Sequence, residues 1–177
     1  MVLEIKMQKP AFTETMQIGI VVRDLDAAIR KYENDYGIGP WEVHKFNPGD
    51  LHDLREYGKP VKHSTRIATT MIGHMMWELI EPLDDESMFA RFLAEKGGGV
   101  HHIAVRAPNF EETVAMQAKQ GKELALSCTF SGIKIAYLAT DRDLGVLIEV
   151  FSGTPGTEQK PDAGFLGRVA HGCRPGR

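Results

Sequence analysis

The chain has 177 residues, of which 42% are hydrophobic and 25% are charged, a composition typical of a globular protein. Its net charge of −3 provides no broad basic surface, so we expect no nucleic-acid partner. The first residues, MVLEIKMQKP, lack the apolar core of a signal peptide, and no run reaches membrane-spanning length. Cys128 and Cys173 lack the spacing of a metal motif. We therefore expect a cytoplasmic protein with reduced thiols and no membrane association.

An internal repeat organises the chain. The segment QIGIVVRDLDAAI (17–29) aligns with HIAVRAPNFEETV (102–114), so that Gln17 falls on His102 and small or apolar positions coincide. Each copy has β-favouring residues followed by a helix-capping residue, Asp24 in the first copy and Asn109 in the second. Each copy therefore predicts a strand followed by a helix.

Three more strands are predicted after each of these helices. They are expected at 41–46, 65–71 and 74–80, and then at 123–130, 133–139 and 145–151. A helix at 87–97 would link the two halves. The fold class is therefore α+β, built from two βαβββ modules.

The predicted organisation has four parts. An N-terminal extension (1–14) precedes the first module (15–84), and the linking helix and second module (85–153) precede a tail rich in Gly and Pro (154–177). Residues 47–64 form a long polar connection that the second half lacks. Because loops of this length are uncommon inside compact domains, we expect a lid, a binding loop or a mobile segment there.

Four polar residues occupy repeat-related strand positions. Gln17 and His102 open the first strand of each half, and Glu78 and Glu149 lie in the last strand of each half. Any one of them alone is more typical of a solvent-facing or core residue. Together they form a set of one imidazole, one amide oxygen and two carboxylates, which suits an octahedral divalent ion. Because strand side chains alternate, we expect His102 to face this site and His101 to face the opposite side.

The motifs IGIVVRDLDAAIRKYENDYGIGPW, WELIEPLDDESMFARFLAEKGGGVHHIAV and GVLIEVFSG resemble the vicinal oxygen chelate (glyoxalase/bleomycin resistance/dioxygenase) superfamily over residues 15–153. The likeness is closest to methylmalonyl-CoA epimerases and glyoxalase-like proteins, since epimerases carry a similar ELLEPL-type strand and GGG-x-HH entry. The resemblance implies that the two modules form a curled mixed sheet with a metal-binding cleft. Its metal ligands fall on Gln17, Glu78, His102 and Glu149.

Two ligand positions depart from the epimerase pattern. Epimerases usually have His where Gln17 stands and Gln where Glu78 stands, whereas this quartet resembles the zinc site of eukaryotic-type lactoylglutathione lyase. The expected cofactor is a divalent ion such as Zn, Co, Ni or Mn. The expected substrate is a small molecule, such as a CoA or glutathione thioester-type compound.

The resemblance implies a metal-dependent isomerase, epimerase or lyase that acts through an enolate or enediolate. Glu149 is the first choice for the catalytic base and Glu78 its partner on the opposite face. The candidates for binding the substrate are His74, Trp41 and Met76. Glu42 is a candidate for an additional catalytic group. Basic residues in or beside the long loop are candidates for binding CoA phosphates: Arg55, Lys59, Lys62 and Arg66.

Two other functions are weighed against this one. An extradiol-type dioxygenase would hold iron with two histidines and one carboxylate, which Gln17 and the extra acid Glu78 disfavour. A metal-free binding or resistance protein of the same superfamily would generally lack the quartet. By analogy with the superfamily, we expect a homodimer.

Overall fold

The structure, a computed structural model, describes residues 12–153. The expected tail, Cys173 and most of the N-terminal extension therefore lie outside the described residues. No helix within 12–153 is long and apolar enough to cross a bilayer.

The two expected βαβββ modules are present. The first comprises β1 (Glu14–Val21), α1 (Leu25–Tyr36), β2 (Glu42–Phe46), β5 (Thr65–Ile72) and β6 (Met75–Pro82). The second comprises β7 (Gly99–Arg106), α3 (Phe110–Lys119), β8 (Leu124–Phe130), β9 (Ile133–Leu138) and β10 (Leu147–Phe151). They are joined by the linking helix α2 (Met88–Lys96), and a short helix α4 (Asp141–Leu144) precedes β10.

Local signals in the sequence explain where the helices begin. Side chains of Asp24, Ser87 and Asn109 each accept a hydrogen bond from a backbone N–H in the first turn of α1, α2 and α3. Such caps satisfy N–H groups that have no partner inside the helix. Gly37 and Gly97, both in the left-handed conformation, end α1 and α2.

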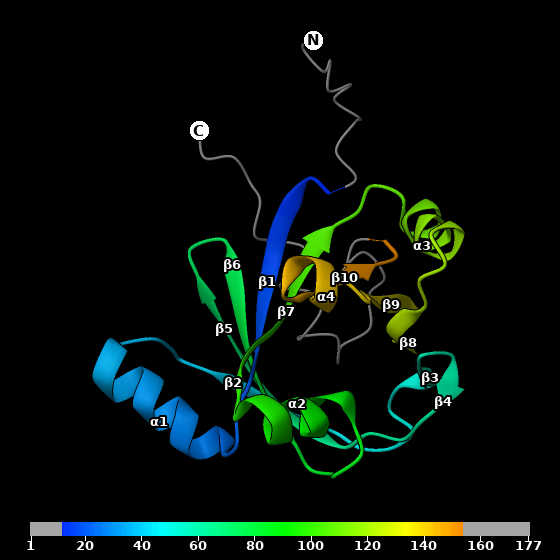
Figure 1. Cartoon of the computed structure of the whole chain (residues 1–177). Coiled ribbons are helices and arrows are strands. Elements are labelled where there is room, and N and C mark those ends of the chain that lie inside the picture. The colour runs from blue at the N-terminus through cyan, green and yellow to red at the C-terminus, as the bar shows by residue number, and fades with distance from the viewer. Residues whose placement is uncertain (1–11, 154–177) are drawn as a thin grey trace, which may run out of the picture.

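All the strands form one mixed sheet in the order β2-β5-β6-β1-β7-β10-β9-β8-β3-β4. At its centre β1 pairs antiparallel with β7, while β1 is parallel to β6 and β7 is parallel to β10. The two modules are thus related by approximate two-fold symmetry through the β1–β7 pair. Figure 1 shows the sheet curling, with α1 and α3 far apart and α2 near the bottom of the view.

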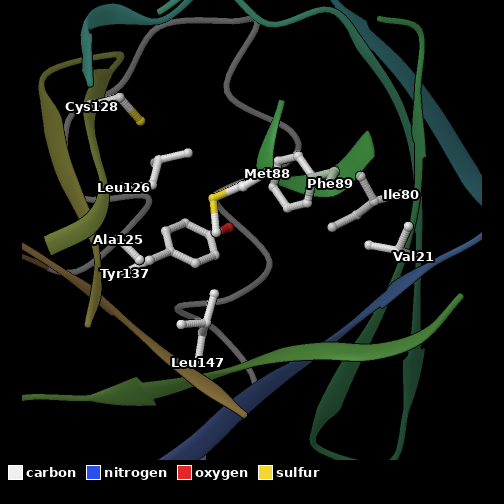
Figure 2. Close-up of a cluster of buried hydrophobic side chains, with 9 residues drawn as sticks. All are labelled: Val21, Ile80, Met88, Phe89, Ala125, Leu126, Cys128, Tyr137 and Leu147. Carbon is white, nitrogen blue, oxygen red and sulfur yellow. The ribbon is translucent and has the colours of Figure 1, made fainter. Parts of the chain in front are cut away.

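The alternation of strand side chains separates two faces of the sheet. On the outer face, α1 packs on a cluster that contains Ile20 and Leu79, and α3 packs on the equivalent cluster with Val105 and Ile148. On the inner face, Phe89 of α2 and its neighbour Met88 pack among residues from both modules, as Figure 2 shows. The helix therefore fills part of the space that the curled sheet encloses.

Two β-bulges interrupt the central β1–β7 ladder. Between the pairs Thr15–Val105 and Gln17–Ala104, β1 contains one extra residue, Met16. Between the pairs Gly19–His102 and Ile20–Val100, β7 contains the extra residue His101. Met16 and His101 are equivalent in the repeat, so each module has a bulge immediately before its Gln17 or His102 position.

The segment 47–64 differs from the expected loop. It contains β3 (His52–Glu56) and β4 (Lys59–Pro60), and β3 pairs with β8 to extend the sheet of the second module. Glu56 is buried at the end of β3, and it accepts a hydrogen bond from Met88 N–H at 2.7 Å. This first-module segment therefore ties the second module to the linking helix.

Candidate active site

The four side chains singled out by the repeat converge at the centre of the inner face. The amide nitrogen of Gln17 lies 2.8 Å from Oε2 of Glu78 and 3.3 Å from Nε2 of His102. The same Nε2 lies 3.4 Å from Oε2 of Glu78 and 3.2 Å from Oε2 of Glu149. All four side chains are buried, and His102 is completely inaccessible.

The strand register explains this convergence. Ala104 lies between Gln17 on β1 and Glu149 on β10, whereas Gly19 lies between Glu78 on β6 and His102 on β7. Each pair of functional side chains thus flanks one small residue, and the two small residues are equivalent in the repeat. Small residues leave the space into which the larger neighbours turn.

Gly19 is required by this packing. A Cβ on residue 19 would lie 2.0 Å from Cε1 and 2.3 Å from Nε2 of His102. The imidazole of His102 therefore packs directly against the backbone of β1 at residue 19, and only glycine leaves room for it.

A cavity that is partly open to solvent adjoins the quartet. Gln17, Glu78 and Glu149 line it, and His102 supports them from below. The rest of the wall is mainly apolar and comes from both modules and α2, including Ile67, Ile80, Phe89, Leu126, Ile135 and Phe151. An apolar cavity with a few convergent polar groups is typical of a small-molecule site.

The quartet is electrostatically coupled. Burial by itself would lower the pKa of His102, but Glu149 and Glu78 outweigh it and raise that pKa to about 9. Burial raises the pKa of Glu78 despite the opposing effect of His102. An imidazolium between two buried carboxylates compensates one of their two charges, whereas a divalent cation would compensate both.

In this structure the four side chains of the quartet contact one another directly. In the described part of the chain, no three or more His, Cys, Asp or Glu side chains form a ready metal site. The chemistry of the donors nevertheless fits an ion. The edges of an octahedron with bonds of about 2.1 Å are about 3 Å long, close to the observed separations. Turning the Gln17 amide over would present its oxygen, and loss of the His102 proton would free Nε2.

One oxygen of Glu149 depends on His102 for its partner. Oε2 of Glu149 is buried and lies 3.2 Å from Nε2 of His102, an ion pair that requires His102 to be protonated. Burial and the charge of Glu149 raise the pKa of Tyr137, and a hydrogen bond to Glu149 contributes to this shift. Because a buried carboxylate oxygen without a partner is costly, a cation or a substrate proton at Oε2 would be favourable once the His102 proton is lost.

The other residues predicted for this site lie elsewhere. Trp41 packs edge-on against Tyr32 of α1, with its indole N–H donating to the carbonyl of Ile38. Met76 is buried in an apolar cluster, and His74 is exposed in the turn between β5 and β6. Together with Glu42, these residues do not contribute to the wall of the cavity.

The predicted orientation of His101 is wrong. The bulge in β7 breaks the alternation, so His101 lies beside His102, with their Nδ1 atoms 3.3 Å apart. Its ring contacts Phe89, Phe92 and Tyr137, and only 4% of its surface is exposed.

His63 is a further residue of the cavity that the sequence does not single out. His63 is buried, lines the cavity, and has Nε2 2.7 Å from Oε1 of Glu56. Oε2 of Glu56 accepts a hydrogen bond from Arg91 at 2.5 Å. No repeat partner or spacing marks His63 and Glu56, because they belong to the segment that the second module lacks.

Comparisons with known proteins agree with the fold. The Bacillus subtilis protein YqjC, described as uncharacterized, is 33% identical over 138 residues, which cover 75% of this chain and 87% of that protein. The mitochondrial methylmalonyl-CoA epimerase of Bos taurus is 28% identical over 141 residues, or 75% of this chain and 70% of that protein.

A solved structure is similar as well. A variant of Streptomyces coelicolor methylmalonyl-CoA epimerase in complex with 2-nitronate-propionyl-CoA superposes with a TM-score of 0.58 at 25% identity, covering 85% of this chain and 99% of that one. A family model matches residues 16–137. The chain therefore belongs to the glyoxalase/bleomycin resistance protein/dioxygenase superfamily.

Proposed function

We propose that the protein is a divalent-metal-dependent epimerase that acts on a CoA thioester with an acidic α-hydrogen, such as methylmalonyl-CoA. The observation that carries the proposal is the contact of Gln17, Glu78, His102 and Glu149 at the bottom of an apolar cavity. Relatives whose names state this activity support the choice of reaction. The structure in complex with a propionyl-CoA derivative supports the choice of substrate class.

The four side chains would hold the ion. When bound, the ion supplies Lewis-acid polarisation of a substrate carbonyl, which acidifies the neighbouring C–H bond. The ion would take the place of the His102 proton in compensating Glu78 and Glu149. Zn, Co, Ni and Mn all accept this mixture of nitrogen and oxygen donors.

Glu149 is the proposed base. Its carboxylate lines the cavity, and replacement of the His102 proton by the ion would leave Oε2 able to accept a proton from the substrate carbon. Tyr137 holds the carboxylate in place through a hydrogen bond. Glu78 is the proposed partner on the other face of the planar enolate. Return of a proton to either face then gives either epimer.

The apolar wall has a role in this reaction. Ile80, Phe89 and Leu126 reduce the access of water to the carboxylates. Low polarity around a carboxylate strengthens its interactions with a nearby cation and prevents loss of the enolate to bulk protonation.

Binding of the CoA phosphates needs cations at the mouth of the cavity. Arg66, one of the residues predicted for this role, already pairs with Asp26 and with Glu81. Its charge is therefore compensated within the protein. Arg55 donates to the carbonyl of Gly58, which leaves its charge uncompensated by that contact. We propose Arg55, Lys59 and Lys62 for the phosphates.

A glyoxalase-like lyase is the second candidate. The observation that favours it is the ligand set itself, because Gln17 and Glu78 stand where the epimerases resembling this chain usually have His and Gln. The same base and cavity would then act on a glutathione hemithioacetal.

Proton exchange separates these functions. The metal-loaded protein is incubated in deuterated buffer with methylmalonyl-CoA, and separately with the glutathione–methylglyoxal hemithioacetal. Deuterium at C2 of methylmalonyl-CoA, with formation of the other epimer, is the expected result. Turnover of the hemithioacetal alone selects the lyase, and exchange in neither substrate contradicts both functions.

Two further expectations remain predictions. We propose that the protein is a homodimer and acts in the cytoplasm, the first by analogy with the superfamily and the second from composition. Sedimentation measurements would test the dimer, and fractionation of the source cells would test the location.

A further inference from the structure

His101 is a buried histidine that the proposed chemistry does not use. It stands in β7 directly before His102, and its ring is enclosed by Phe89, Phe92 and Tyr137 at centroid distances of 4.9, 5.0 and 6.4 Å. Burying an imidazole among aromatic rings costs free energy unless its nitrogens are hydrogen-bonded. Its Nδ1 has such a partner, since it lies 3.3 Å from Nδ1 of His102.

The β-bulge creates this contact. In a regular strand the side chains of residues 101 and 102 would point to opposite faces. The extra residue in β7 places both on the inner side, and the equivalent bulge in β1 places Met16 beside Gln17. A thioether accepts hydrogen bonds only weakly, so the bulge residue of β7 is an effective acceptor and the bulge residue of β1 is not.

The roles of the two nitrogens follow from the surroundings of His102. Its Nε2 faces Gln17, Glu78 and Glu149, so this is the atom that would bind a cation with its lone pair. The ring proton must then reside on Nδ1, whose neighbour is Nδ1 of His101. A histidine that binds a metal through one nitrogen usually donates from the other to an acceptor that fixes its orientation.

We infer that His101 is a positioning residue, whose Nδ1 accepts a hydrogen bond from Nδ1–H of His102 and so presents Nε2 of His102 to a divalent cation. This inference rests on the proposed function for the presence of the ion. It explains why β7 contains a histidine pair and why the first histidine is buried in an aromatic enclosure.

Three variants test the inference. His101→Phe keeps an aromatic ring in the enclosure and removes the acceptor. His101→Asn places an amide oxygen near the position of Nδ1 and restores it. Phe92→Leu is the matched control, since it alters the enclosure and keeps the imidazole.

Metal affinity is the first measurement. Metal-stripped protein is titrated with Co²⁺ in a calorimeter. We expect His101→Phe to weaken binding about 10- to 100-fold, the usual effect of removing a group that orients a metal ligand. His101→Asn and Phe92→Leu are expected to remain within about threefold of the wild type. Wild-type affinity in His101→Phe, or equal losses in the Phe and Asn variants, would overturn the inference.

Nitrogen NMR of the metal-free protein gives a readout that does not depend on the ion. A slowly exchanging proton between the two Nδ1 atoms is expected in the wild type and in Phe92→Leu, and should be lost in His101→Phe. Its absence from the wild type would overturn the inference. If the wild type shows this proton and takes up no Co²⁺, the hydrogen bond stands and the proposed function fails.

Discussion

The imidazole of His102 occupies the space directly above Gly19, where any Cβ would lie 2.0 Å from its Cε1 atom. The two residues are paired across the central β1–β7 ladder. This contact couples the first module to the proposed ligand of the second, because a side chain on residue 19 would push the imidazole away from Glu78 and Glu149.

Gly19→Ala should therefore weaken metal binding by at least 10-fold and lower the free energy of unfolding by about 1–3 kcal/mol, the usual cost of overpacking. Calorimetric titration and urea unfolding would measure the two effects. Ala104→Gly, at the equivalent position, is the control, because it adds no atom and should leave affinity nearly unchanged. Equal affinity in Gly19→Ala and the wild type would mean that His102 does not bind the ion.

Glu149→Gln should abolish proton exchange without unfolding the protein. The substitution keeps the size of the side chain and removes the basic oxygen, and loss of a general base lowers rates about 10²- to 10⁴-fold. Deuterium incorporation into methylmalonyl-CoA measures this step. Glu111→Gln, at an exposed residue paired with Lys134, should leave exchange intact. Exchange at the wild-type rate in Glu149→Gln would assign the base to another group.

Glu56 should make stability depend on acid pH. Burial by itself would raise its pKa, but hydrogen bonds from His63, Arg91 and Met88 N–H outweigh this effect, and the pKa lies below its ordinary value of 4.5. The carboxylate therefore stabilises the folded state fully above pH 4.5. This contribution is lost as the pH falls below 4.5 and through the lower folded-state pKa.

Glu56→Gln tests this dependence. Urea unfolding at pH 7 should show a loss of about 3–5 kcal/mol, as expected for breaking a buried ion pair. The difference in the free energy of unfolding between the wild type and Glu56→Gln should become smaller as the pH approaches 3. The exposed Glu95 provides the control, since Glu95→Gln should change stability little at either pH. A difference that stays constant with pH would show that charge on Glu56 does not stabilise the fold.

The metal-free protein should lose stability at alkaline pH. The pKa of His102 is raised from 6.5 to about 9 by the two glutamates, which outweigh burial. A raised pKa stabilises the folded state below pH 6.5, and this contribution is lost as the pH rises through 9. The free energy of unfolding should fall by about 2–3 kcal/mol over that range. His102→Gln should show no such fall, whereas the control His52→Gln, at an exposed residue, should show the same fall as the wild type. A wild-type free energy of unfolding that does not change over this pH range would contradict the pairing of His102 with the two glutamates.

The fold could be predicted because the internal repeat is visible in the sequence itself. The alignment of Gln17 with His102 fixed the order of strands and helices in both modules, and the superfamily and the fold class are confirmed. The caps at Asp24 and Asn109 form as predicted. Periodicity and capping are local, so they can be read without knowledge of distant contacts.

The parts that were not predictable depend on contacts distant in sequence. β3 is a short polar strand whose stability comes from pairing with β8, and its residues HDLRE show no clear alternation. Burial of His63 and Glu56 likewise depends on α2. The bulge at His101 follows from a change of register with β1, which a single strand does not reveal.

The central claim is that one divalent cation binds Gln17, Glu78, His102 and Glu149 together. Anomalous diffraction from Co²⁺-loaded crystals, measured at the cobalt absorption edge, tests it most directly. We expect a single strong peak within about 2.3 Å of one oxygen or nitrogen atom from each side chain. A cobalt peak bound at another place, or no peak after loading, would contradict the account.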